Sequence, residues 1–388
     1  MARQKPEIGG FDSGLLDVEI TGVEAIPLRI PLNNPTKLSH GAARDEIDIV
    51  VVRLHTSAGV SGVGETQAWR RQGNAETLPG LLAIIREHFT PLLIGRSPFA
   101  LPSLMQSLDS TMYHTLYAQA PIGDALYDLQ GKLLGVPLYM LLGGKCRDKV
   151  SVGCVVYIKP TLEETLALAQ DFYDQGIRSF SVKIGNDFEA DLRNVRAVRE
   201  RFGDEIVLRV DANAAMEFND SLRFLRKIEP LNIAAAEQMV PMWDVDGMAE
   251  LARRVDIPLM TDECVATDRD LINVIRKRAA SVTQTKIGKN GGVWRCHRLW
   301  QIADAAGMQI YPGNHPATSI AILAKAHLAA AWPGSLLDGV FACGIGVLSE
   351  DVVTEPVCMD GRYVPVPDAP GLGVTLDEDR IGRFRVDL

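Results

Sequence analysis

Apolar residues in the first 66 positions follow the alternating pattern of β-strands. Residues 47–55 form a β-branched run that ends at the turn Ser57-Ala58-Gly59, and a second short strand completes a hairpin. From residue 76 to residue 142 the period becomes helical, with Leu78, Leu81 and Ile85 on one face. This part of the chain is therefore expected to form an α+β domain.

From residue 150 the chain alternates between strand-like and helical segments. A capping box at Thr161 and Glu164 opens the first of these helices. The strand-like runs are 150–157, 179–184, 206–210, 233–236, 257–260, 281–287, 308–311 and 336–341. Repeated βα units predict a parallel sheet, and eight of them favour closure into a barrel. The predicted fold class is α/β, a (β/α)-barrel preceded by the α+β domain.

These changes of pattern predict the domain boundaries. Residues 1–145 are assigned to the α+β domain and residues 146–348 to the barrel. Residues 349–388 are rich in proline and glycine and are predicted to form a C-terminal segment without a domain of its own.

Ionisable residues recur at the C-terminal ends of successive predicted strands. Five of them, spaced by 28, 26, 25 and 24 positions, are Lys183, Asp211, Glu237, Asp262 and Lys286. Each interval is about one βα unit. The C-terminal strand ends of a barrel form a single rim, and active sites of such enzymes lie there. The fold is therefore expected to bring the five side chains together.

Three of these residues, Asp211, Glu237 and Asp262, would crowd like charges in a partly buried cup. That arrangement costs several kcal/mol unless a cation compensates it. Three oxygen ligands without histidine or cysteine favour Mg²⁺, or Mn²⁺ in its place, over zinc. Any one carboxylate alone could equally be a helix cap or a salt-bridge partner, but three in register indicate a metal site.

The two lysines, Lys183 and Lys286, follow predicted strands two and six, which lie opposite one another in an eight-stranded barrel. A substrate held between them would have one lysine on each face. A lysine acts as a base only when neutral, so its pKa must fall from about 10.4 towards about 7–8. A nearby metal ion and desolvation both lower it. Either lysine alone would more often be a surface residue.

Composition limits the partners. The net charge is −9 and the sequence pI about 5.4, which argue against nucleic acid or an anionic membrane as a partner. The longest apolar runs are far shorter than a membrane span, and the first residues lack the apolar core of a signal peptide. The six cysteines form no CxxC pair, as expected of free thiols in a cytoplasmic protein. A homo-oligomer acting on a small molecule is expected.

Several motifs resemble those of the enolase superfamily, specifically its muconate lactonizing enzyme subgroup, over nearly the whole chain. These motifs are Ala125-Leu126-Tyr127-Asp128-Leu129, Leu141-Leu142-Gly143-Gly144, Asp211-Ala212-Asn213, Glu237-Gln238, Asp262-Glu263, Gln284-Thr285-Lys286 with Gly291-Gly292, and Pro370-Gly371-Leu372-Gly373. The resemblance implies a modified TIM barrel under an N-terminal capping domain, to which the C-terminal segment returns. It implies Asp211, Glu237 and Asp262 as metal ligands, and loops near 31–45 and 66–76 as substrate-selecting.

Two positions depart from this family pattern. The second strand reads Ser181-Val182-Lys183 where the family has Lys-x-Lys, so Lys183 lacks a neighbouring positive charge that would help to lower its pKa. Either Lys183 is a weaker base at neutral pH, or the substrate supplies a cation. Met239 stands where a proline commonly follows the glutamine. The mandelate racemase subgroup, with its histidine–aspartate pair, fits less well because strand six offers a lysine.

The resemblance implies that the enzyme coordinates a substrate carboxylate to Mg²⁺ and abstracts its α-proton to give a metal-stabilised enediolate. With a base on each face, racemisation or epimerisation is the favoured outcome, and cycloisomerisation or dehydration is the alternative. A non-catalytic metal-binding barrel remains open. A nicotinamide enzyme is disfavoured because no G-x-G-x-x-G follows the first predicted strand.

Four further residues are expected to contact the substrate: Trp69, Ser181, Asn213 and Asp338. Asp338, on predicted strand eight, would face a substrate from the side opposite Glu237 and pair with an amine, which favours an amino-acid-like substrate over a diacid. Alternatively, Asp338 turns outward, and Trp69 packs on the barrel surface. His315 is placed at the rim of the seventh strand, where a loop or supporting role is favoured over a catalytic one.

Overall fold

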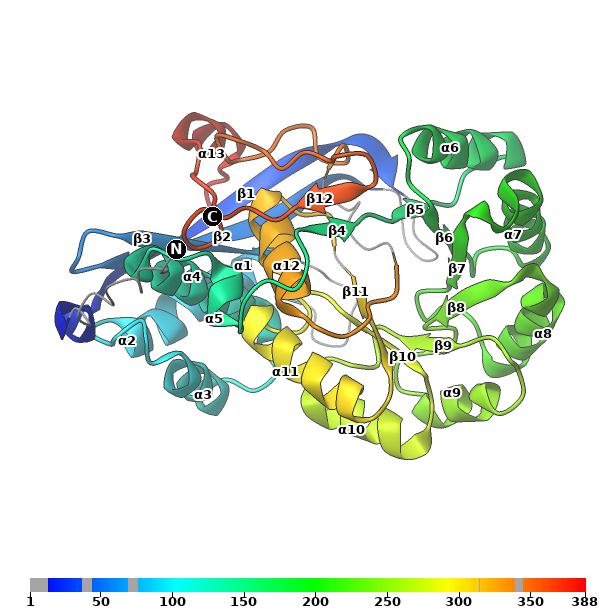
Figure 1. The fold of residues 1–388 in the computed structure, drawn as a ribbon, viewed down its shortest axis with the longest axis horizontal. Coiled ribbons are helices and arrows are strands. Elements are labelled where there is room, and N and C mark those ends of the chain that lie inside the picture. The colour runs from blue at the N-terminus through cyan, green and yellow to red at the C-terminus, as the bar shows by residue number, and fades with distance from the viewer. Residues whose placement is uncertain (1–12, 37–43, 69–75, 314, 339–344) are drawn as a thin grey trace, which may run out of the picture.

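The computed structural model describes residues 13–36, 44–68, 76–313, 315–338 and 345–388. An antiparallel sheet near the N-terminus and a curled parallel sheet form its framework, and helices surround both (Figure 1). This is the predicted fold class: a barrel-type α/β sheet preceded by an α+β portion. No helix within these ranges is long and apolar enough to cross a membrane.

The antiparallel sheet has the order β1 (Ile20–Thr36), β2 (Arg44–Thr56) and β3 (Ser61–Gln67), which confirms the predicted hairpin. Its helical partners are α1 (Leu78–Ala83), a π-helical turn (Ile84–Phe89), α2 (Thr90–Leu93), α3 (Leu101–Thr111), α4 (Leu116–Leu134) and α5 (Leu138–Leu141). Helix α4 packs directly on β3 because Gly62 and Gly64 lack side chains. A Cβ atom on Gly64 would lie 2.1 Å from the carbonyl oxygen of Pro121.

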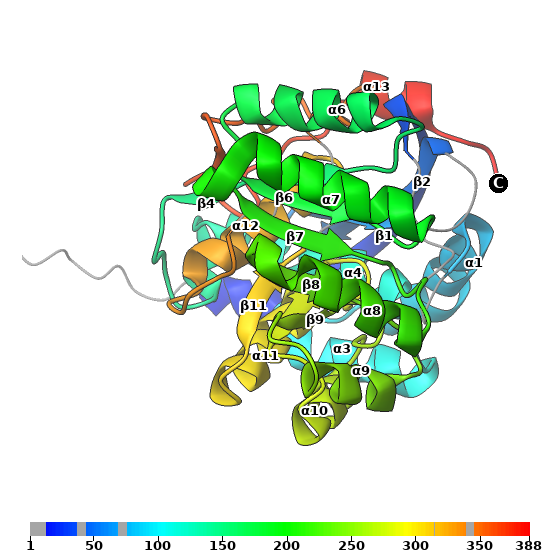
Figure 2. The same cartoon turned by 90° about the vertical axis from the view of Figure 1, so that its right-hand side faces the viewer.

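Seven strands in sequential order make up the parallel sheet. They are β5 (Cys154–Val156), β6 (Ser179–Lys183), β7 (Val207–Asp211), β8 (Ile233–Glu237), β9 (Leu259–Thr261), β10 (Val282–Thr285) and β11 (Gln309–Pro312). The helices between and after them are α6 (Leu162–Asp174), α7 (Phe188–Phe202), α8 (Phe218–Ile228), α9 (Val245–Ala252), α10 (Asp268–Lys277), α11 (Gly292–Ala305) and α12 (Ser319–Ala331). Helices α6 to α9 cover the outer face of the sheet, as Figure 2 shows.

The two ends of this sheet differ from the prediction. Within the described residues, the predicted eighth strand makes a single parallel bridge, from Leu336 to Ile310, and its second half lies outside them. The predicted first strand is split at its middle. Its start, β4 (Lys149–Ser151), pairs instead with β12 (Tyr363–Pro365), because the C-terminal segment returns alongside it.

The C-terminal segment contacts both sheets. Beyond β12, Gly371 forms a bridge to Pro137, and Arg385, after α13 (Glu378–Phe384), forms one to Leu28 of β1. This path joins the two ends of the chain. The domain boundaries at residues 145 and 348 remain a prediction.

Buried carboxylates of the N-terminal portion bind backbone N–H groups elsewhere in the chain. Asp128 accepts hydrogen bonds from the backbone nitrogens of Val63 (2.8 Å) and Leu372 (2.7 Å) and from Lys132 Nζ (2.6 Å). Asp124 accepts one from the nitrogen of Val293 (2.7 Å), in the first turn of α11. These bonds tie α4 to the hairpin, to the C-terminal segment and to the barrel.

We expect Asp128→Ala to lower the free energy of unfolding by about 3–5 kcal/mol, because it leaves two buried N–H groups and a lysine without their acceptor. Urea denaturation measures this change. Glu87→Ala, at an exposed position, is the control and should stay within about 0.5 kcal/mol of the unmodified chain. A loss below about 1 kcal/mol for Asp128→Ala would contradict the assigned role.

Burial raises the pKa of Asp124 to about 7, more than its bond from Val293 lowers it. The folded state therefore holds this proton more tightly than the unfolded state does, and the stability it contributes at pH 4 is lost as the pH rises through about 7. We expect Asp124→Asn to remove this loss, on the order of 3–4 kcal/mol between pH 4 and pH 7.5. Parallel pH–stability curves for both proteins would disprove it.

Candidate active site

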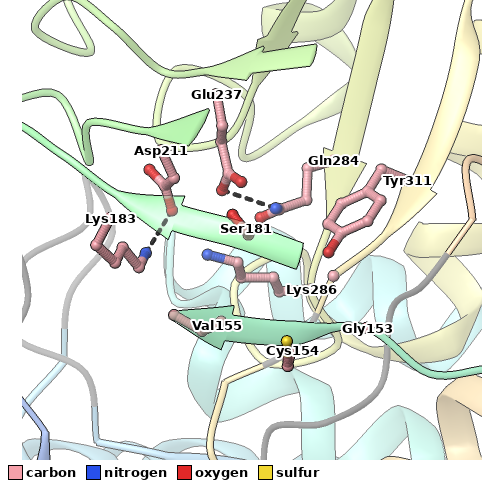
Figure 3. Close-up of a pocket in the computed structure, with 11 residues that line it drawn as sticks. Gly153, Cys154, Val155, Ser181, Lys183, Asp211, Glu237, Gln284, Lys286 and Tyr311 are labelled. Atoms are coloured by element: carbon pink, nitrogen blue, oxygen red, sulfur yellow. Dashed lines mark hydrogen bonds and ion pairs between the residues drawn. The ribbon is translucent and has the colours of Figure 1, made fainter. Parts of the chain in front are cut away.

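Strand ends of the parallel sheet surround a pocket in the barrel mouth (Figure 3). It is lined by Gly153, Cys154, Val155, Ser181, Lys183, Asp211, Glu237, Gln284, Lys286, Tyr311 and Gly313. Four of the five predicted rim residues are in this set. The fifth, Asp262, directly follows β9 and contacts Lys286. The parallel register aligns Lys183 with Asp211 and Asp211 with Glu237, so the βα spacing of the sequence becomes proximity in space.

Lys183 is paired with the carboxylate of Asp211 and donates a second hydrogen bond to Asn213 Oδ1 at 2.8 Å. Asn213 adopts a left-handed backbone conformation (φ 44°), which asparagine tolerates better than most residues. Its backbone nitrogen also donates to Asp211 Oδ1 at 2.8 Å. The turn after β7 thus holds both partners of Lys183 in place.

Across the pocket, Lys286 donates to Asp262 Oδ2 at 2.5 Å. Lys289, which is 1% exposed, lies 3.1 Å from Asp262 Oδ1 and donates to the carbonyl oxygens of Asp262 and Val265. Two ammonium groups therefore surround one carboxylate. Although burial acts in the opposite direction, Lys286 and Lys289 hold the pKa of Asp262 below its usual range.

The other carboxylates of the cluster are less well compensated. Burial, followed by the charges of Asp211 and Asp262, raises the pKa of Glu237 well above its ordinary value. The same causes raise the pKa of Glu263 to about 8. Glu263 Oε2 is buried and has no hydrogen-bond partner among the described residues. The cluster therefore carries more acid than its lysines can neutralise.

These residues fit a divalent cation in their chemistry. The predicted ligands supply only carboxylate oxygens, and the raised pKa values of Glu237 and of the neighbouring Glu263 are the consequence expected of crowded acids without enough compensating charge. Among the described residues, however, no group of three or more Asp, Glu, His or Cys side chains is arranged so that it could hold a metal ion. Two of the three predicted ligands face lysines instead.

The lysine pKa values run against the sequence-based expectation. Burial lowers the pKa of Lys183 and Lys286, but the adjacent carboxylates outweigh it and the net shift is upward for both. The physical reason is the ion pairs, Lys183 with Asp211 and Lys286 with Asp262. A cation bound by these carboxylates would break the ion pairs that stabilise the charged lysines and would lower the lysine pKa values.

The residues predicted to contact the substrate differ in their distance from the pocket. Ser181 lines the pocket, and Asn213 is hydrogen-bonded to Lys183, which lines it. Asp338 does not line it: its backbone carbonyl accepts hydrogen bonds from Ser179 and Arg209. Trp69 lies outside the described residues. His315 is 3% exposed and its ring stacks on that of Tyr117, with the centroids 6.0 Å apart.

Some site residues were not singled out from the sequence. Gln284 Nε2 donates to Glu237 Oε1 at 2.7 Å, and Gln238 Oε1 accepts from the backbone nitrogens of Asp262 (3.1 Å) and Cys264 (3.2 Å). Lys289 and Glu263 complete the charge cluster. Two signals were available: Gln284, Gln238 and Glu263 stand in the motifs of the family resemblance, and all four residues lie within three positions of a predicted ligand or lysine.

Two family descriptions match the chain. Residues 20–143 match the mandelate racemase/muconate lactonizing enzyme N-terminal domain, and residues 164–380 match the enolase C-terminal domain-like family. Together they cover the antiparallel sheet, strands β6 to β11 of the parallel sheet and most of the residues that line the pocket.

Individual relatives span almost the whole chain. Muconate cycloisomerase 1 of Pseudomonas putida is 33% identical over 95% of this chain and 99% of its own length. The N-succinyl-L-Arg/Lys racemase of Bacillus cereus is 30% identical over 95% and 98%. The solved muconate lactonizing enzyme of Pseudomonas fluorescens, complexed with muconolactone, superimposes with a TM-score of 0.91 at 32% identity, over 95% of this chain and all of that one. The chain therefore belongs to the mandelate racemase/muconate lactonizing enzyme family of the enolase superfamily and is an enzyme of the isomerase class.

Proposed function

We propose that this isomerase is Mg²⁺-dependent, with Mn²⁺ as a substitute, and removes the α-proton of a small carboxylate substrate. The observation that carries the proposal is the placement of two lysines, Lys183 at the end of β6 and Lys286 after β10, on opposite strands around one pocket. Asp211, Glu237 and Asp262 would hold the ion, which when bound supplies positive charge for the substrate carboxylate.

In this proposal the lysines move the proton. One ammonium group is released from its carboxylate and becomes neutral by losing a proton to solvent, and it then takes the α-proton. The other lysine, still charged, returns a proton to the opposite face of the same carbon. Asn213, bonded to Lys183, keeps that lysine oriented during the exchange. A proton removed from one face and returned to the other inverts the carbon, so a racemase or epimerase results.

The substrate class we propose is an amino-acid derivative. The B. cereus relative, a racemase of N-succinyl-L-Arg/Lys, supports it. The sequence-based reason, an amine paired with Asp338, has no geometric support, because Asp338 does not line the pocket. A homo-oligomer in the cytoplasm remains our prediction for the quaternary state and location.

Cycloisomerisation of a diacid is the second candidate, favoured by the 33% identity to muconate cycloisomerase 1. It would need one lysine as an acid or base and the other as a fixed charge. A cycloisomerase exchanges the α-proton of its lactone on one face only, so stereochemistry separates the two candidates.

We expect Glu237→Ala to weaken Mn²⁺ binding and to slow α-proton exchange by at least about a thousandfold, since it removes a carboxylate from the proposed ligand set. Calorimetry measures the first effect, and exchange with D₂O, followed by NMR, measures the second. Glu217→Ala, an exposed glutamate in the loop after β7, is the control and should change neither. Full activity of Glu237→Ala with a chelator present would refute the metal site.

We expect the two lysine variants to differ in stereochemistry. Lys183→Ala should slow exchange from one enantiomer by about a hundredfold or more while leaving exchange from the other, and Lys286→Ala should show the reverse preference. Mn²⁺ affinity, measured in both variants, shows whether the ligand set is intact. Equal loss for both enantiomers in both variants would instead favour a one-base mechanism such as cycloisomerisation.

A further inference from the structure

Two buried polar side chains line the pocket but have no part in the proposed proton transfer. Ser181 projects from β6 and Gln284 from β10, on opposite sides of the barrel, and they are 4% and 2% exposed. Figure 3 shows both among the residues around the same space, together with Lys286.

The orientation of the Gln284 amide follows from its neighbour. Its Nε2 donates to Glu237 Oε1 at 2.7 Å, and Glu237 can only accept when it is ionised, as a ligand of the proposed ion would be, so the amide oxygen points away from Glu237. That oxygen is buried and has no hydrogen-bond partner among the described residues. Gly313 leaves room for the amide, because a Cβ atom there would lie 2.6 Å from Gln284 Cδ.

The Ser181 hydroxyl is also without a partner among the described residues, but unlike the Gln284 oxygen it is not among the fully buried atoms. Within the described parts of the chain it forms no hydrogen bond, whereas Ser179, on the same face of the same strand, donates to the carbonyl of Asp338 at 2.7 Å and accepts from Arg209 at 2.8 Å. A buried acceptor without a donor is costly, so the pocket favours a ligand that brings one.

We propose that Ser181 and Gln284 form a subsite for a hydrogen-bond donor of the substrate, the N–H of an N-acylated amino acid. The proposal rests on the proposed function and narrows its substrate class. Lys286 lines the same pocket, so the donor would lie next to the carbon that exchanges its proton. A muconate dianion has no N–H or O–H group and would leave the Gln284 oxygen unpaired.

The test compares isosteres that differ only in the donor. N-succinyl-L-alanine and O-succinyl-L-lactate have the same carboxylates and the same α-hydrogen, but the ester lacks the N–H. With the Mg²⁺-loaded full-length protein, calorimetry should give a dissociation constant about tenfold lower for the amide. Ser181→Ala and Gln284→Met should each reduce that preference to about twofold or less.

Ser179→Ala is the matched control, since its hydroxyl is already bonded and does not line the pocket, and it should keep the tenfold preference. If Gln284→Met also weakens Mn²⁺ binding through Glu237, Ser181→Ala alone decides. Equal affinity for amide and ester, binding of neither, or a preference that survives in Ser181→Ala would overturn the subsite.

The subsite and the proposed function fail in different ways. A tenfold preference for the amide without α-proton exchange from either compound would contradict the proposed function and leave the subsite standing. Exchange from both compounds with equal affinities would contradict the subsite alone.

Discussion

Charge compensation in a buried cluster is the constraint on which the site depends. Asp211, Glu237, Asp262 and Glu263 are each at most 7% exposed, and the cationic groups among them are Lys183, Lys286 and Lys289. Buried like charges are tolerated only when opposite charges or protons neutralise them. Here two carboxylates are paired with lysines and two have raised pKa values, as expected of a cluster that lacks a further positive charge.

The N-terminal portion holds this cluster in place from outside the barrel. Asp124 of α4 binds the start of α11, just beyond Lys286, and a Cβ atom on Gly292 would lie 2.9 Å from the carbonyl oxygen of Ala120. Glu65 of β3 accepts hydrogen bonds from the nitrogen and hydroxyl of Thr318, at the start of α12. The starts of α11 and α12, which follow β10 and β11, are therefore held by contacts with α4 and the antiparallel sheet.

The sequence predicts the parallel sheet and the residues at its C-terminal rim because each strand, with the polar residue that follows it, is visible in a short stretch of sequence. Each apolar run is followed by a polar residue at the spacing of one βα unit, and parallel register turns that spacing into proximity, as for Lys183, Asp211 and Glu237. Contacts between distant segments leave no such signal: the pairing of β4 with β12 joins residues far apart in the chain. Distances across the barrel decide which carboxylate each lysine pairs with and how Gln284 is oriented. The spacing of residues along the sequence does not determine these distances.

We propose that a divalent ion, not the lysines, is the partner that the three carboxylates require during catalysis. A crystal structure of the Mn²⁺-loaded protein, with the ion located by its anomalous scattering, tests it most directly. We expect one peak coordinated by oxygens of Asp211, Glu237 and Asp262, with Lys183 and Lys286 no longer bonded to those ligands. Saturating Mn²⁺ with no peak among the three carboxylates, and both ion pairs intact, would contradict it.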